Sequence, residues 1–227
     1  MDRLAYHTSS QAHTKSGRLR HILPLTTKLT LIFTLFALYA CSIANNTYNP
    51  LDDYEDLTPY TIMDAPESNG EQFQSYDPKQ TAKGKYLVEV LGCGTCHTNG
   101  ALIGTPDFDR RMAGSSVGIA YSNPLKEKNP GVVFPPNLTP DIKTGIGSWS
   151  KQQVMRAIHH GINKEGKPLM TVMPWPAYSK ISPEDAEAIA AYLRGLAPVE
   201  HQVPLNVEPG TETSALYVHF GVYRNRQ

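Results

Sequence analysis

The stretch that decides the fold is Cys93-Gly94-Thr95-Cys96-His97, in which two residues separate the cysteines and a histidine follows directly. The chain has three cysteines and eight histidines among its 227 residues, so the pattern would arise by chance in roughly one such sequence in a thousand. Three cysteines exclude a disulfide-stapled scaffold and a zinc site with four cysteines. The motif is therefore the strongest chemical signal in the sequence.

The C-x-x-C-H spacing has a specific chemical meaning. Two intervening residues let both sulfurs reach the two vinyl groups on one side of a porphyrin, while the adjacent imidazole turns onto the iron. The motif therefore predicts one covalently bound haem c, attached through Cys93 and Cys96, with His97 as an iron ligand.

Two other interpretations of the motif compete with haem attachment. A thioredoxin-type redox dithiol also uses C-x-x-C, but its motif follows a strand and begins a helix, which lowers the pKa of the first thiol. A zinc site would place His97 directly beside Cys96, which strains a tetrahedral geometry, and the sequence has no second C-x-x-C and no H-x-x-x-H. We favour haem attachment because the motif follows a predicted helix.

That helix covers residues 81–91, TAKGKYLVEVL, directly before the motif. Apolar side chains recur there at helical spacing, and Gly92 stands where a helix C-terminus favours glycine. The predicted core positions are Tyr86, Leu87, Val90 and Leu91.

Two further helices are predicted after the motif. Ser150 and Gln153 form a capping box, and the apolar stripe that follows stops at Gly161. Ser182 and Pro183 are start signals of a last helix. Its predicted core face consists of Ala186, Ile189, Ala190, Leu193 and Leu196.

The region between the motif and the middle helix, residues 98–149, is rich in Gly, Pro, Asn and Asp. A loop of this length inside a compact domain is uncommon, so something other than secondary structure must organise it. A large apolar prosthetic group, wrapped by the loops, would supply the missing core.

Residues 83–198 resemble a class I cytochrome c domain, of the type found in the cytochrome subunits of membrane-bound bacterial alcohol and gluconate dehydrogenases. Besides the motif, the resemblance is carried by residues 84–87, 137–141, 144–150, 173–178 and 191–194. It implies an all-α cytochrome c fold, with three or more helices and long loops wrapped around one covalent haem. Those subunits carry three such domains, whereas this chain has one motif.

The resemblance also implies how the first and last helices meet. They cross closely in related cytochromes, so we expect Gly84 and Tyr86 to contact Ala190, Tyr192 or Leu193.

The second axial ligand decides whether a haem transfers electrons or binds small ligands. Pro174 and Pro176 fix the backbone around Met173, and the Met-Pro pair matches the family pattern there, so Met173 is the predicted sixth ligand and Met170 the second choice. The candidates weighed were Met112, Met155, Met170, Met173, His159, His160 and His201.

Two side chains are candidates for contacts with the haem propionates. Trp149 has an indole N–H that needs a partner when buried, and Asn137 follows a Pro-Pro turn. The alternatives are that Trp149 is a core aromatic and that Asn137 closes its own loop.

The N-terminal sequence predicts export and a lipid anchor. Basic residues precede an apolar run at residues 29–40, a pattern typical of a signal peptide and too short for a stable transmembrane helix. Leu38-Tyr39-Ala40-Cys41 resembles the lipobox of bacterial lipoproteins, which implies lipidation of Cys41 after cleavage. We therefore expect a signal peptide at residues 1–40 and an anchor on the periplasmic side of a bacterial membrane.

Charge divides the rest of the chain. Residues 42–78 contain eight acidic residues and no Lys or Arg, whereas residues 79–198 contain fourteen basic and nine acidic residues. We predict an acidic flexible tether at 41–78, a monohaem domain at 79–198 and a tail at 199–227. Residues 215–223 in the tail are apolar enough for a strand, which either docks on a partner or packs on its own domain.

Together these features predict an electron-transfer protein rather than an enzyme: a lipid-anchored monohaem cytochrome. It would pass single electrons from a dehydrogenase or quinol-oxidising complex to another cytochrome or a terminal oxidase. No small-molecule substrate is expected, and a net charge of zero gives no electrostatic footprint for nucleic acid. Two alternatives stay open. In the first, the sixth axial position of the iron is open or its ligand is labile, as in a peroxidase-like enzyme or gas sensor. In the second, the chain is a fixed cytochrome subunit of a dehydrogenase or respiratory complex.

Overall fold

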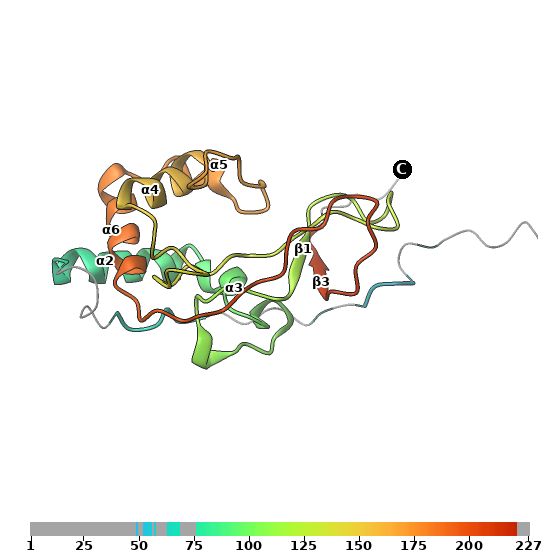
Figure 1. Ribbon diagram of the computed structural model, residues 1–227, viewed down its shortest axis with the longest axis horizontal. Coiled ribbons are helices and arrows are strands. Elements are labelled where there is room, and N and C mark those ends of the chain that lie inside the picture. Colours follow the sequence, from blue (N-terminus) through green and yellow to red (C-terminus); the bar gives the residue numbers. More distant parts are fainter. Residues whose placement is uncertain (1–48, 50–51, 56, 58–62, 69–75, 222–227) are drawn as a thin grey trace, which may run out of the picture. The chain divides into compact units, whose positions relative to one another are not determined.

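The computed structural model describes residues 49, 52–55, 57, 63–68 and 76–221 (Figure 1). Its elements, with η for 3₁₀ helices, are α2 (Pro78–Val90), α3 (Cys93–His97), η1 (Ala101–Ile103), η2 (Phe108–Arg110), β1 (Gly118–Ala120), β2 (Val132–Val133), α4 (Lys151–His160), α5 (Trp175–Tyr178), α6 (Pro183–Arg194) and β3 (Tyr217–His219). The mainly helical cytochrome c fold predicted from the sequence is confirmed.

Helix α2 begins earlier than the predicted residue 81. Its N-cap is Asp77, whose carboxylate accepts a hydrogen bond from the backbone N–H of Lys79 at 3.1 Å, and Pro78 occupies the first turn. Asp followed by Pro is a start signal that apolar periodicity does not register. The helix ends before Gly92, as predicted, and the φ of 68° at Gly92 lies in the left-handed region that glycine adopts without strain.

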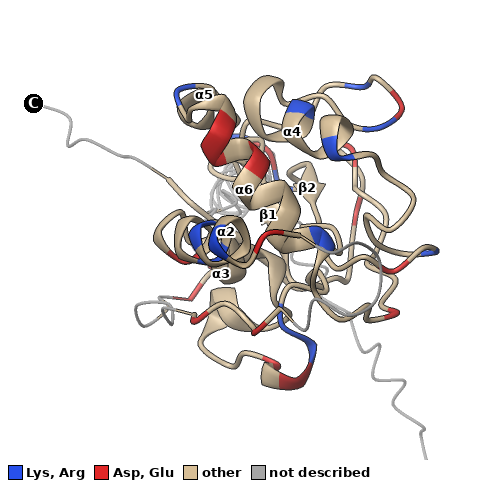
Figure 2. Cartoon of the chain, turned by 90° about the vertical axis from the view of Figure 1, so that its left-hand side faces the viewer, with Lys and Arg blue, Asp and Glu red and all other residues tan. Residues whose placement is uncertain are grey.

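Helices α2 and α6 cross closely, and Gly84 makes the crossing possible (Figure 2). A Cβ atom at residue 84 would collide with the backbone carbonyl of Ala188 and lie 2.7 Å from Cβ of Tyr192. The predicted contact between Gly84 and Tyr192 is therefore confirmed. The ion pair between Lys83 and Asp185 also joins the two helices.

The predicted apolar face of α2 is only partly right. Leu87 and Leu91 pack against the core, but Tyr86 and Val90 are 62% and 64% exposed. The buried positions of the helix are Gly84 and Val88. The expected contact of Tyr86 with α6 is wrong, because the helices approach through the face that carries the smallest residue.

The start signals of α4 and α6 act as predicted. Ser150 Oγ accepts from the Gln153 N–H at 3.1 Å, Gln153 Oε1 accepts from the Ser150 N–H at 2.8 Å, and Gly161 ends α4 with a φ of 60°. Ser182 Oγ accepts from the Asp185 N–H at 3.1 Å at the start of α6. The five residues predicted to form the core face of the last helix are all buried: Ala186, Ile189, Ala190 and Leu193 in α6, and Leu196 just after its end.

A small sheet was not predicted. Its strand order is β2-β1-β3, with β1 antiparallel to β2 and parallel to β3. Val218 of β3 packs with Leu102, Val117 and Ile119 in a second hydrophobic cluster. Strands of two or three residues are too short to display a period of two in the sequence. The strand predicted in the tail thus packs on its own domain.

Part of the predicted tether also lies on the helices. Ala65 is buried in the main hydrophobic cluster, and the Pro66 carbonyl accepts from the Tyr192 hydroxyl at 2.5 Å. The Ser68 hydroxyl donates to the Gly195 carbonyl at 2.7 Å. Residues 63–68 therefore differ from the expected free tether, because the buried side chains of Met63 and Ala65 and these hydrogen bonds fix the segment near the end of α6.

The predicted signal peptide and Cys41 lie outside the described residues. Within the part of the chain that the structure describes, no helix combines the length and the apolar composition needed to cross a membrane.

Candidate haem site

The C-x-x-C-H motif forms its own short helix, α3, directly after α2. The left-handed backbone at Gly92 turns the chain between the two helices. At the other end of α3, the backbone N–H of Gly114 donates to the carbonyl of His97 at 2.9 Å. The motif is thus fixed at both ends, and it follows a helix as predicted.

The imidazole of His97 is oriented for binding a metal. Its Nδ1 lies 2.8 Å from the Pro136 carbonyl oxygen. A carbonyl only accepts hydrogen bonds, so Nδ1 carries the proton and the lone pair is on Nε2. Burial lowers the pKa of His97, against a smaller opposing effect of this hydrogen bond. Burial therefore favours the neutral ring, which is the form that binds iron.

The two thiols lie in an apolar environment. Burial raises the pKa of Cys93 to about 12 and also raises that of Cys96. A catalytic redox dithiol requires the opposite shift, because its first thiol must ionise near neutral pH. The electrostatics therefore disfavour the redox-dithiol interpretation.

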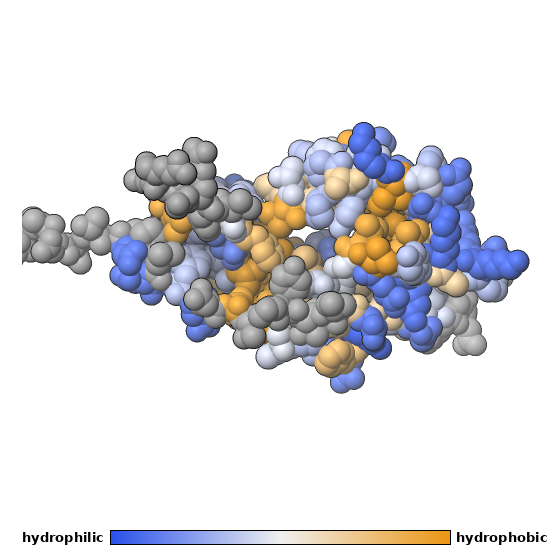
Figure 3. Space-filling view, turned by 180° about the vertical axis from the view of Figure 1, so that it is seen from behind, coloured by the Kyte–Doolittle hydropathy of each residue, from blue (hydrophilic) through white to orange (hydrophobic). Residues whose placement is uncertain are grey.

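Cys93, Cys96 and His97 line a cavity of about 300 Å³. This volume lies within the ~300–1,000 Å³ typical of cofactor and ligand sites. Figure 3 shows a hollow on the rear face of the domain with hydrophobic residues on both sides of it. The apolar residues of the wall include Leu91, Ile119, Val133, Leu138, Ile146, Val154, Ala157, Ile158, Leu169, Val172, Ile189 and Leu193. The donor set and this wall fit a haem group.

Two of the seven candidates for the sixth ligand, Met170 and Met173, line this cavity. Met112 is completely buried in the core cluster, and Met155 packs against that cluster. The His201 imidazole lies 2.8 Å from the Ala113 carbonyl. Of the candidates for the sixth iron ligand, the cavity therefore favours Met170 and Met173. Met173 stays the predicted ligand and Met170 the second choice.

Met173 lies in a tightly turned segment. Its N–H donates to the Met170 carbonyl at 3.2 Å, and its carbonyl accepts from the Trp175 N–H at 2.7 Å. Helix α5 begins directly after Pro174. Met170 is 40% exposed, whereas Met173 is half-buried and stands directly before Pro174. This rigidity is the property from which the sequence favoured Met173.

Trp149 and Asn137, the two candidates for propionate contacts, also line the cavity. The Trp149 carbonyl accepts from the guanidinium of Arg194. The Asn137 amide donates to Thr144 Oγ1 and to the Val199 carbonyl, and its oxygen accepts from Thr139. These bonds favour the alternative in which Asn137 closes its loop.

Two contributors to the site were missed by the sequence analysis. Pro135 and Pro136 were identified only as a turn, although the Pro136 carbonyl sets the tautomer of His97. The Tyr178 hydroxyl donates to the Leu91 carbonyl at 3.2 Å and so joins α5 to the end of α2. A Pro-Pro pair downstream of the motif was the available signal for the first. Tyr178 ends the family-like stretch at residues 173–178, but that stretch gave no partner for its hydroxyl.

A helical domain with C-x-x-C-H on a short helix, an oriented imidazole and an apolar cavity defines a c-type haem protein. Residues 81–197, just over half of the chain, match the Cytochrome c family. The chain therefore belongs to the cytochrome c family, whose members bind haem covalently and transfer electrons.

Similar proteins are cytochrome subunits of dehydrogenases. The chain is 36% identical over 118 residues to the gluconate 2-dehydrogenase cytochrome c subunit of Pantoea cypripedii, covering 52% of this chain and 23% of that protein. It is 34% identical over 125 residues to the alcohol dehydrogenase (quinone) cytochrome c subunit of Gluconacetobacter polyoxogenes, covering 54% and 23%. The fructose dehydrogenase cytochrome subunit of Gluconobacter japonicus is 33% identical over 112 residues, covering 49% and 20%. The matched region thus spans about a quarter or less of these relatives.

Proposed function

We propose that the protein is a lipid-anchored monohaem cytochrome that transfers single electrons between redox partners. The observation that carries the proposal is the 2.8 Å contact between His97 Nδ1 and the Pro136 carbonyl, which leaves Nε2 for iron beside the two motif cysteines. Bound haem would supply an iron that changes oxidation state without a substrate bond.

The residues around the cavity would each contribute to this role. Cys93 and Cys96 would hold the porphyrin covalently, and His97 and Met173 would occupy the two axial positions. The apolar wall would exclude water from the iron, and a thioether ligand raises the reduction potential relative to a second imidazole. With both axial positions filled by protein, the site is suited to electron transfer rather than to substrate chemistry.

Anchoring and location belong to the same proposal. The apolar run at residues 29–40 and the lipobox-like cysteine at position 41 support export and lipidation. Acyl chains contribute about 0.8 kcal/mol per buried methylene, so a lipidated Cys41 would keep the domain at the periplasmic side of a membrane.

A second candidate is a fixed cytochrome subunit of a dehydrogenase complex. It is supported by the similarity of the chain to cytochrome subunits of gluconate, alcohol and fructose dehydrogenases. Co-purification of a dehydrogenase with the chain from a detergent extract would favour this candidate. Isolation of the chain alone, with electron exchange to several acceptors, would favour the carrier.

Mass spectrometry of the chain purified from a host that makes c-type cytochromes tests the central proposal. We expect the mass of the processed polypeptide plus one haem and the lipid on Cys41, and a red colour that stays with the protein in acid-acetone. Extraction of the colour into the solvent would refute covalent attachment. An unmodified Cys41 would refute the anchor alone.

The pair Met173→Ala and Met170→Ala tests the sixth ligand. We expect carbon monoxide to leave the spectrum of the reduced wild type and of Met170→Ala nearly unchanged, and to shift that of Met173→Ala strongly. The opposite pattern would assign Met170 as the ligand. A rapid, large shift in the wild type would instead favour the gas-binding or peroxidase-like alternative.

A further inference from the structure

We propose that Asn137 is a positioning residue for the iron ligand. It holds the Pro136 carbonyl against the Nδ1–H of His97 and couples this hydrogen bond to the C-terminal segment at residues 199–201. The inference rests on the proposed haem-binding function and concerns residues one step removed from the iron.

The side chain of Asn137 is fully used by the protein. Its Nδ2 donates to Thr144 Oγ1 at 3.0 Å and to the Val199 carbonyl at 2.7 Å. Its Oδ1 accepts from the N–H and the hydroxyl of Thr139, at 2.9 and 2.8 Å. A neutral amide offers two donors and two lone pairs, so no capacity is left for a propionate. The residue is 1% exposed, which makes these four bonds costly to break.

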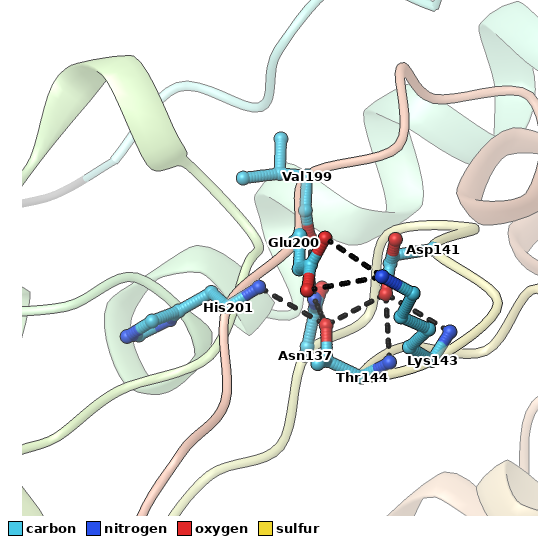
Figure 4. A network of polar contacts seen from close by, with 7 residues as sticks. All are labelled: Asn137, Asp141, Lys143, Thr144, Val199, Glu200 and His201. Atoms are coloured by element: carbon cyan, nitrogen blue, oxygen red, sulfur yellow. Dashed lines mark hydrogen bonds and ion pairs between the residues drawn. The ribbon is translucent and has the colours of Figure 1, made fainter.

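The Thr144 hydroxyl links Asn137 to two other segments (Figure 4). It accepts from the His201 backbone N–H at 3.0 Å and from Asn137 Nδ2, and it donates to Asp141 Oδ1 at 2.8 Å. The Asp141 carboxylate also accepts from the Thr144 N–H at 2.7 Å. The loop at residues 141–144 and the segment at 199–201 therefore close on Asn137 from different parts of the chain.

The backbone around Pro136 is fixed as tightly as the side chain of Asn137. The Ser115 N–H donates to the Pro135 carbonyl at 3.0 Å, and the Leu138 N–H donates to the Met112 carbonyl at 2.8 Å. A Cβ atom at Gly114 would lie 2.8 Å from the Asn137 nitrogen and 2.9 Å from the Pro136 carbonyl carbon. The Pro136 carbonyl oxygen thus has little freedom to leave His97.

Met112 adds evidence that this arrangement is imposed by its surroundings. Its φ of 64° is the one positive value at a non-glycine residue in the described part of the chain. A left-handed backbone at such a residue persists only when neighbouring contacts enforce it. Those contacts are the hydrogen bonds of its N–H to Thr98 Oγ1, at 3.1 Å, and of its carbonyl to Leu138.

The hydrogen bond at Nδ1 matters for the iron as well as for the fold. An acceptor that hydrogen-bonds to the other ring nitrogen fixes the orientation of a ligating imidazole and raises its basicity. A more basic imidazole stabilises ferric over ferrous iron, which lowers the reduction potential. Loosening the Pro136 carbonyl should therefore raise the potential, whereas a residue that only stabilises the fold would leave it unchanged.

The test compares the holoproteins of Asn137→Ala and Thr144→Val with the wild type, and uses Ser182→Ala at the N-cap of α6 as a control. We expect a higher reduction potential in both network variants, with the larger shift in Asn137→Ala. We also expect exchange of the His97 Nδ1–H, followed by proton NMR, to be roughly five- to tenfold faster, since one hydrogen bond contributes about 1 kcal/mol. Ser182→Ala should lower the unfolding temperature and leave both readouts at wild-type values.

Reduced stability with an unchanged potential and exchange rate in both network variants would overturn the inference. Thr144→Val keeps the shape of the side chain, so it carries the test if Asn137→Ala does not fold. Absence of covalent haem from the wild type would overturn the proposed function as well. Variants that carry haem but keep the wild-type potential and exchange rate would overturn only the inference on Asn137, so the two failures can be told apart.

Discussion

Helices α2, α4 and α6 carry their own start and stop signals and bury apolar faces against one another. Residues 98–149 and 199–219 have little regular structure and are joined by hydrogen bonds between distant segments, such as Asn137 with Val199. The helical part therefore depends on local sequence and packing. The loop-and-sheet part depends on long-range hydrogen bonds and on what fills the cavity.

The largest expected effect comes from preventing haem attachment with the double variant Cys93→Ser, Cys96→Ser. The cavity wall would lose its apolar filling, so amide hydrogen exchange should accelerate most in residues 112–149 and 199–207 and least at the α2–α6 crossing. Hydrogen exchange read by mass spectrometry would check this. Thr95→Ser is the matched control, because it changes a residue of the same short helix and keeps both motif cysteines and His97. Equal acceleration of amide hydrogen exchange in the helical part and in the loop-and-sheet part would contradict this difference between them.

The next largest effect is expected within the helical part, at Gly84. Gly84→Val would force α2 away from the Ala188 carbonyl, and overpacking of this kind costs about 1–3 kcal/mol. Denaturant unfolding of the holoprotein would measure the loss. Ala82→Val, at an exposed position of the same helix, should cost only the smaller helix-propensity difference. Equal losses in both variants would show that the crossing is not tight.

A smaller effect is expected where α5 meets the end of α2 beside the cavity. Tyr178→Phe removes the hydroxyl that donates to the Leu91 carbonyl, and one such hydrogen bond contributes about 1 kcal/mol. The unfolding free energy should fall by about this amount. Tyr86→Phe serves as the control, because Tyr86 is exposed on α2. A wild-type unfolding free energy for Tyr178→Phe would refute the joining role of the hydroxyl.

The smallest effect is a pH dependence in the helical part. The hydrogen bond from Lys83 lowers the pKa of Asp185 below its usual 3.8. Because the folded pKa is the lower one, the pair stabilises the fold fully above about pH 4, and this contribution is lost as the pH falls through the folded value. Lys83→Met should therefore be slightly less stable than wild type at neutral pH and equal to it in strong acid.

An exposed charge on the connection between α4 and α5 provides the control for this pH effect. Lys167→Met removes one positive charge from an exposed position. Its stability relative to wild type should not change over the same acid range. A constant difference between Lys83→Met and wild type at every pH would contradict the assignment to Asp185.

The features that the sequence predicted correctly are those with local signals. The caps at Ser150 and Ser182 and the break at Gly92 are local signals, so the helices they bound were found. The covalent motif is local too, and it placed Cys93 and Cys96 on the cavity wall. Met170 and Met173, named from a short stretch around two prolines, also line the cavity, and the choice of Met173 as iron ligand stays a prediction.

Features formed by distant residues were not found. The pairing of β1 with β3, the acceptor for His97 and the packing of residues 63–68 on α6 each join segments far apart in sequence. Asn137 was identified as a site residue, but its hydrogen bonds with Val199 point to a role in the fold rather than in direct contact with the cofactor. Single-sequence patterns carry no information on such pairings.

Strand β3 lies beside β1 although residues 121–216 separate them. During synthesis the attachment motif leaves the ribosome long before β3 and Val199 are made. The pairing of β1 with β3 and the hydrogen bond of Asn137 to Val199 therefore form only after almost the whole domain has been translated. Until then the two thiols of the motif belong to a chain whose loop-and-sheet part is still incomplete.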